Sequence, residues 1–96
     1  MPASNSRTEA FQPGTTVTAG VASVSLAATN VGRGTLIVCN DHATNIIYLK
    51  LGDASAVVGS GPRLNAAGGV LVLEGYRGAV QVISTGAATN VTVTEV

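Results

Sequence analysis

The sequence predicts an all-β protein, a small antiparallel β-sandwich or jelly-roll-like barrel of about eight short strands with a flexible N-terminal arm. Two observations support this fold class. From Thr15 onward, short runs rich in Val, Ile, Leu and Thr are separated by Gly, Asn, Asp and Pro, which is the usual pattern of strands and turns in a sandwich or small barrel. No window shows the roughly 3.6-residue apolar period of a long amphipathic helix. A chain of 96 residues is long enough for one such domain with a thin core.

The chain is expected to divide into an arm and one domain. Residues 1–14 are polar, contain Pro2 and Pro13 and show no periodicity, so we expect them to be flexible, with Phe11 as their only large apolar side chain. Residues 15–96 form the predicted sandwich domain. Its strands are expected, in chain order, at residues 15–19, 22–26, 35–40, 46–51, 63–66, 70–74, 79–84 and 91–96, of which 63–66 has the weakest pattern.

Alternation of apolar and polar residues predicts which side chains of several strands face the core. The core positions predicted in this way are Val24, Leu26, Val80, Val82, Val91 and Val93. The runs 46–51 and 70–74 are apolar on both faces, so we expect these strands to be either central in the sandwich or covered by a neighbouring subunit. Cys39 ends the apolar run Leu36-Ile37-Val38-Cys39 and is therefore predicted to be a buried, inert thiol.

The predicted surface is poor in charge. Charged residues make up 10% of the chain, and five acidic residues balance five basic ones. Such a surface provides little electrostatic repulsion between copies, so we expect a homo-oligomer. The basic residues are scattered rather than clustered, which argues against a nucleic-acid partner. The apolar runs are only strand-length and the N-terminus lacks the apolar core of a signal peptide, so we expect no membrane association and a protein kept in the cytoplasm until assembly.

The residues with catalytic or metal-binding chemistry are few and dispersed. The only imidazole is His42, which lies beside Asp41 in a predicted hairpin loop and is interpreted as a turn residue rather than a general base. One His and one Cys cannot supply the three or four protein ligands of a zinc site. The acidic residues do not form the dense loop that calcium requires. We therefore expect a non-enzymatic protein with no catalytic residues, cofactor or metal.

Two further features leave alternatives open. The segment at 27–31, Ala-Ala-Thr-Asn-Val, recurs at 87–91, which indicates either an internal duplication or a repeated use of the same turn chemistry before a strand. Tyr76 lies in the short segment Glu74-Gly75-Tyr76-Arg77-Gly78 between two predicted strands. An aromatic residue in such a turn either plugs the core or contacts a partner.

The order of these segments also carries a resemblance. Residues 30–40 read Asn-Val-Gly-Arg-Gly-Thr-Leu-Ile-Val-Cys-Asn and are followed by Asn-Ile-Ile-Tyr-Leu-Lys-Leu-Gly at 45–52. Leu-Asn-Ala-Ala-Gly-Gly at 64–69 then leads into a strand, Gly-Tyr-Arg-Gly at 75–78 makes the next corner, and Val-Thr-Val-Thr-Glu-Val closes the chain. Over residues 15–96 this order resembles small β-sandwich virion proteins of tailed phages. The resemblance implies a non-catalytic virion component, often a trimer.

The function expected from these observations is that of a capsid decoration (cement) protein, which binds the outer surface of the shell formed by the major capsid protein and stabilises it. The alternative is a tail- or fibre-associated receptor-binding module. A decoration protein would be located in the virion, at the capsid surface. The residues expected to contact the capsid or a neighbouring subunit are Arg7, Phe11, Arg33, Arg63, Tyr76 and Arg77.

Overall fold

The computed structural model of the protein describes residues 14–96. The predicted contact residues Arg7 and Phe11, and nearly all of the predicted arm, lie outside the described residues. The prediction of an all-β fold is confirmed. Eight strands are present, namely β1 (Thr15–Ala19), β2 (Val24–Ala27), β3 (Thr35–Asn40), β4 (Ile47–Leu51), β5 (Arg63–Leu64), β6 (Gly69–Glu74), β7 (Val80–Ser84) and β8 (Thr89–Glu95).

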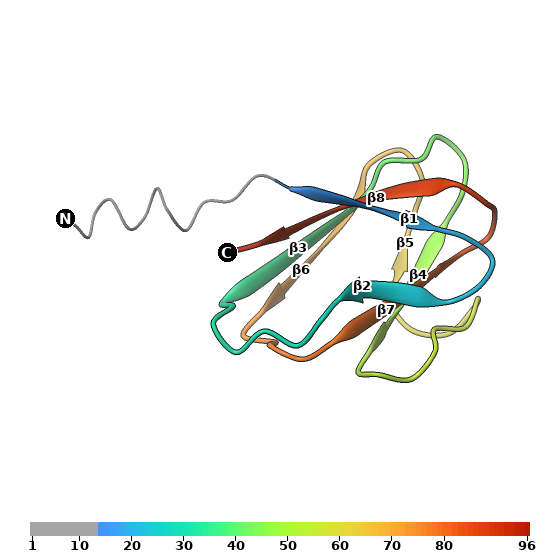
Figure 1. Cartoon of the computed structure of the whole chain (residues 1–96). Coiled ribbons are helices and arrows are strands. Elements are labelled where there is room, and N and C mark those ends of the chain that lie inside the picture. Colours follow the sequence, from blue (N-terminus) through green and yellow to red (C-terminus); the bar gives the residue numbers. More distant parts are fainter. Residues whose placement is uncertain (1–13) are drawn as a thin grey trace.

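The strands form two four-stranded antiparallel sheets, ordered β1-β8-β3-β6 and β2-β7-β4-β5, which face each other as two layers (Figure 1). Four of the pairings, β1 with β8, β2 with β7, β3 with β6 and β4 with β5, make the chain one long antiparallel hairpin whose tip lies between β4 and β5. The hairpin is rolled up so that β3 also pairs with β8 and β4 with β7. This arrangement is a jelly roll.

The core lies between the two sheets and is filled by alternate residues of the central strands. Its most deeply buried aliphatic side chains are Leu36, Val38, Ile47, Leu49, Val80, Val82 and Val91. Each contributes about 1.5–3 kcal/mol through removal of its apolar surface from water. The predicted inward positions Leu26, Val80, Val82, Val91 and Val93 are confirmed. No described residue belongs to a helix that could cross a membrane.

The prediction that Val24 is buried in the core is wrong, although it pairs with the core residue Val82 of β7. Further along, the alternation of β2 is interrupted. Its register with β7 shifts between Ser25 and Ala27, so that two successive residues, Leu26 and Ala27, are both buried. A shift of this kind is a β-bulge, which redirects side chains at a sheet edge. Val24, on the outermost strand of its sheet, is left 36% exposed.

The prediction that Cys39 is buried in the core is also wrong. Leu36, Val38 and Asn40 of β3 point inward and are buried, so Cys39 lies on the outer face of the sheet and is half-buried. The run Leu36-Ile37-Val38-Cys39 is apolar throughout, so it gave no signal of which residues face inward. Partial burial, a hydrogen bond from the Cys39 Sγ to Asp41 Oδ1 (3.4 Å) and the charge of that carboxylate raise the pKa of the Cys39 thiol.

The two strands that are apolar on both faces differ in position. Strand β4 lies between β7 and β5, as expected for a central strand. Strand β6 is the outermost strand of its sheet, and its Val70 and Val72 are 57% and 49% exposed. For β6 the alternative of a central position is therefore wrong, and the alternative of a neighbouring subunit over those two valines stays a prediction.

The repeated five-residue segment adopts two different structures. At 27–31 it ends β2 and enters a loop, whereas at 87–91 it completes a turn and begins β8. In the second copy Ala88 has a φ of 56°, in the left-handed region. The residue with left-handed geometry is thus Ala88 rather than the asparagine expected from turn chemistry. The two copies share a composition without sharing a backbone conformation.

Candidate functional site

Three of the predicted contact residues, Arg33, Tyr76 and Arg77, lie together at the end of the sandwich where β3 begins. Arg33 precedes β3 and is 1% exposed, whereas Arg77 is exposed and Tyr76 is half-buried. The loops that carry them are joined by backbone hydrogen bonds, including one from Asn30 N to Arg77 O (2.9 Å). This end of the molecule is therefore built from segments that are far apart in the sequence.

The Arg33 guanidinium is the centre of this end. Its Nε donates to the carbonyl oxygen of Tyr76 (3.1 Å) and its Nη2 to that of Gly78 (2.6 Å). Its Nη1 donates to the carbonyl oxygen of Ala28 (3.4 Å) and forms an ion pair with Glu95 Oε2 (3.1 Å). The planar fork of an arginine can reach several acceptors at once. Arg33 thereby ties the loop before β3, the loop between β6 and β7, and the end of β8.

This burial changes the role expected for Arg33. A side chain that is fully enclosed by its own subunit has no surface to present to a capsid or to another copy, so a direct contact role does not fit its position. Sequence reasoning missed the burial because Gly32 and Gly34 flank Arg33 and give it the appearance of an exposed loop residue. Three of its four acceptors are backbone carbonyls, whose positions cannot be predicted from the pattern of side chains.

Tyr76 packs against the core, whereas Arg77 lies at the surface. The Tyr76 ring packs against the hydrophobic core and its hydroxyl donates to Ala79 O (2.8 Å), which favours the core-plug alternative. Gly78 beside it has no room for a side chain, because a Cβ there would lie 2.5 Å from the Tyr76 hydroxyl. Arg77 donates from Nε to Arg33 O (3.0 Å) and remains exposed, so it is still a possible contact residue.

Arg63 lies away from this cluster. It is an exposed residue of β5, paired with Tyr48 of β4, and its Nε donates to Asn65 Oδ1 (3.0 Å). The predicted contact residues in the described part of the chain are thus not one site. Arg77 and Arg63 are separate exposed cations at different places on the surface.

The opposite end of β3 is closed by neutral polar groups. Asn40 is buried, and its side-chain amide donates to the carbonyl oxygens of Asn45 (2.9 Å) and Leu64 (3.2 Å) while its Oδ1 accepts from His42 N (3.1 Å). His42 Nδ1 accepts from the backbone N–H groups of Thr44 (3.1 Å) and Asn45 (2.9 Å). His42 therefore organises the loop, in agreement with the turn role predicted for it.

The outer face of the β1-β8-β3-β6 sheet is the largest feature that sequence reasoning did not assemble. Strand register places its side chains in two rows. We call this surface the threonine–valine face, and its residues are Thr16, Thr92, Cys39 and Val70 in one row and Thr94, Ile37 and Val72 in the other. None of these side chains carries a charge, and the nearest carboxylates, Asp41 and Glu74, lie at its two ends. The sequence signal was the Val-Thr alternation of β8 together with the double apolar face of β6.

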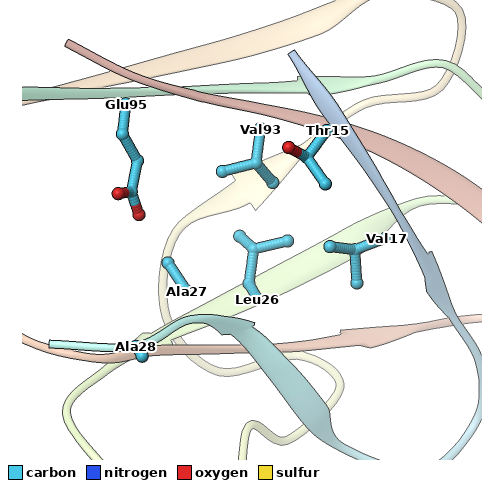
Figure 2. Close-up of a pocket in the computed structure, with 7 residues that line it drawn as sticks. All are labelled: Thr15, Val17, Leu26, Ala27, Ala28, Val93 and Glu95. Atoms are coloured by element: carbon cyan, nitrogen blue, oxygen red, sulfur yellow. The ribbon is translucent and has the colours of Figure 1, made fainter. Parts of the chain in front are cut away.

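A groove opens between the two sheets where their edge strands β1 and β2 face each other. Its volume is about 410 Å³, and its walls are mainly apolar (Figure 2). The residues that line it are Thr15, Val17, Leu26, Ala27, Ala28, Val93 and Glu95. Its one carboxylate, that of Glu95, already pairs with Arg33 and accepts from Asn30 Nδ2 (2.8 Å). The groove thus offers apolar walls without a group of free polar side chains to orient a ligand.

Within residues 14–96, no cluster of three or more His, Cys, Asp or Glu side chains could hold a metal ion. Comparison of the chain with models of protein families, with curated proteins and with solved structures found no match.

Proposed function

We propose that this protein is a non-enzymatic structural component of a tailed-phage virion, which decorates the capsid by binding the outer surface of the major capsid protein. The observation that carries the proposal is the threonine–valine face. The jelly roll itself is shared by proteins of many functions and does not decide among them. The resemblance of residues 15–96 to small β-sandwich virion proteins favours the same function.

The composition of the threonine–valine face suits docking onto another protein. Burial of a charged side chain is costly unless it is paired, and this face has none to bury. Its Thr and Val side chains are short, so they lose little conformational entropy when a partner orders them. The strands beneath are hydrogen-bonded to each other along their lengths, which makes the face a preformed, rigid surface.

The size of the face indicates that one copy alone would bind weakly. Four strands about 4.8 Å apart, with about four residues each at about 3.3 Å per residue, span roughly 250 Å². A stable interface usually buries about 800 Å² on each partner. Firm attachment to a capsid therefore requires several copies acting together or additional contacts, for which Arg77 is available at the surface. Binding by linked copies gains affinity without any new type of contact.

The proposal is tested by co-sedimentation of the purified protein with undecorated capsids assembled from the major capsid protein that accompanies it. We expect the wild type to sediment with the capsids, and Thr94→Lys, which places a cation in the middle of the face, to lose at least about tenfold in affinity, or about 1.4 kcal/mol. Gln81→Lys is the matched control, because Gln81 is half-buried on the other sheet.

The control should bind like the wild type. Failure of the wild type to bind capsids would contradict the proposed function, and binding to purified tails instead would favour a tail or fibre location. Equal binding by Thr94→Lys and the wild type would show that the threonine–valine face is not the docking surface.

A further inference from the structure

The four outermost strands of the two sheets are not equally protected against pairing with another chain. Strand β2 has its register shift between Ser25 and Ala27, and β5 is two residues long, follows Pro62 and carries the charge of Arg63. Three of the five residues of β1 are threonines. Strand β6 has six residues in continuous register with β3 and no charge before Glu74. Bulges, prolines, charges and short length are the features that keep sheet edges from pairing. Strands β1 and β6 both lack them, apart from Glu74 at the end of β6, and β6 is the longer of the two and the one with exposed valines on its outer face.

The side chains of β6 are also incompletely buried. Val70 and Val72 point outward and are 57% and 49% exposed. Leu71 and Leu73 point inward and pack against the core, yet they are only half-buried because, among residues 14–96, no strand lies beyond β6. A further strand alongside β6 would complete the burial of these two leucines and cover the flanks of the two valines.

The charged residues near the two ends of β6 lie on opposite faces of the sandwich. Glu74 is exposed at its C-terminal end. Near its N-terminal end, Arg63 belongs to β5 of the other sheet, where the next residue, Leu64, is buried, so the Arg63 side chain points to the outer face of that sheet and donates to Asn65 Oδ1 (3.0 Å). Within residues 14–96 the only ion pair is Arg33–Glu95, so neither Glu74 nor Arg63 has a charged partner there.

We propose that β6 is the edge at which a second copy of this chain adds, through antiparallel pairing of the two β6 strands across a two-fold axis. Directly opposed residues in an antiparallel pair point to the same face. Pairing centred on Val72 therefore sets Val72 against its counterpart, Leu71 against Leu73 and Val70 against Glu74. The two Glu74 carboxylates then lie at opposite ends of the paired strands. Parallel pairing would instead bring the two Glu74 carboxylates side by side.

This pairing has two consequences for the assembled protein. The two β1-β8-β3-β6 sheets become one continuous sheet, which doubles the extent of the threonine–valine face. A contact in which the same surface is used by both copies closes at two copies, so we expect a dimer in place of the trimer that the resemblance implies. An edge of six residues is about 20 Å long, so the interface is small and the dimer should dissociate on dilution.

The test is sedimentation equilibrium of the isolated full-length chain across a series of micromolar concentrations. We expect a monomer–dimer equilibrium for the wild type. Val72→Lys, which places two cations opposite each other at the axis, should raise the dissociation constant at least about tenfold. Val57→Lys is the matched control, because Val57 is a similarly exposed valine (59%) in the loop at the tip of the hairpin. It should dimerise like the wild type.

A second charge substitution tests the proposed geometry. Val70→Lys places a cation opposite Glu74 of the other copy, twice in the dimer, so it should weaken the dimer less than Val72→Lys does, and adding Glu74→Gln should remove that advantage. A wild type that stays monomeric throughout, a Val72→Lys variant that dimerises normally, or a Val70→Lys variant that is as weak as Val72→Lys would each overturn the proposal. No capsid is present in these measurements, so their failure is distinguishable from failure of the proposed function.

Discussion

Strand β3 connects two ends of the sandwich that are closed in different ways. Where β3 begins, one buried cation, Arg33, collects three backbone carbonyls and the Glu95 carboxylate. Where β3 ends, the buried amide of Asn40 makes three hydrogen bonds, to Asn45, Leu64 and His42. Beside it Ser84 Oγ and Thr89 Oγ1 form a buried contact (2.7 Å), and Asn45 Nδ2 donates to Thr89 Oγ1 (2.9 Å).

Both ends address the same physical requirement. Where the chain crosses from one sheet to the other, backbone groups lose their sheet partners, and when buried they must find others. The Arg33 end meets this requirement with one long side chain, and the other end with several short neutral ones. We therefore expect stability to depend on a single residue at the first end and to be distributed over several residues at the second. The predictions below test that difference.

The largest effect is expected for Arg33→Met, which keeps the length of the side chain but removes every donor. It leaves three partly buried hydrogen-bond acceptors and a partly buried carboxylate without their partner, and loss of one member of a buried ion pair typically costs about 3–5 kcal/mol. The measurement is the free energy of unfolding in urea. Arg77→Met, at an exposed neighbour, is the control and should change stability by less than about 1 kcal/mol.

A domain of this size has a total stability of only about 5–15 kcal/mol, so Arg33→Met could fail to fold. Glu95→Gln is the milder variant for that case, because it removes the charge of the acceptor and retains an oxygen for Arg33. It should destabilise the protein by less than Arg33→Met. Near-equal stability of Arg33→Met and the wild type would contradict the central role assigned to Arg33.

A smaller effect is expected for Asn40→Ala at the other end. The variant leaves Asn45 O, Leu64 O and His42 N without their partner, and a buried polar group left unsatisfied costs about 1–3 kcal/mol. Because the Ser84–Thr89–Asn45 network remains, we expect about 2 kcal/mol in the same urea experiment. Asn90→Ala, at an exposed asparagine of β8, should have almost no effect. A loss as large as that of Arg33→Met would show that the neutral end also depends on one residue.

The strands could be predicted from the sequence because alternation and turn residues are local signals. All eight predicted runs overlap observed strands, and Val80, Val82, Val91 and Val93 face the core as their alternation indicates. The prediction for Val24 was wrong because β2 is the outermost strand of its sheet, which the composition of the strand does not reveal, although Val24 pairs with the core residue Val82. Cys39 was misplaced because its run contains no polar residue to set the phase.

The candidate site could be predicted only in part, because it depends on which strands become neighbours. The burial of Arg33 is decided by the carbonyls of Tyr76 and Gly78, more than forty residues away. In the same way, the sequence shows that residues 70–74 are apolar on both faces, but only the strand order reveals β6 as an edge. Long-range pairing of this kind leaves no local pattern.

The smallest effect on stability is expected at Cys39, which adjoins Asn40 but faces outward. A thiol that is half-buried loses little when replaced by a hydroxyl, so Cys39→Ser should change the free energy of unfolding by less than about 1 kcal/mol, below the 1–3 kcal/mol typical of a hydroxyl placed in an apolar core. The thiol also reports on the local electrostatics. Partial burial, the hydrogen bond to Asp41 and the negative charge of Asp41 all raise its pKa, because each favours the neutral thiol over the thiolate.

Only the thiolate is an effective nucleophile, so alkylation of native Cys39 by iodoacetamide should be slow at neutral pH and should accelerate as the pH rises toward the raised pKa. Asp41→Asn removes the carboxylate and should lower the pKa, which increases the labelling rate at mildly alkaline pH, while the contribution of burial persists. Glu74→Gln, which removes a charge at the far end of the threonine–valine face, is the control and should leave the rate unchanged.

If Asp41→Asn labels no faster than the wild type, burial alone sets the pKa of the Cys39 thiol. If instead wild-type Cys39 labels at the rate of an unfolded chain at neutral pH, the outer face around Cys39 is more open than its contacts with Asp41 indicate.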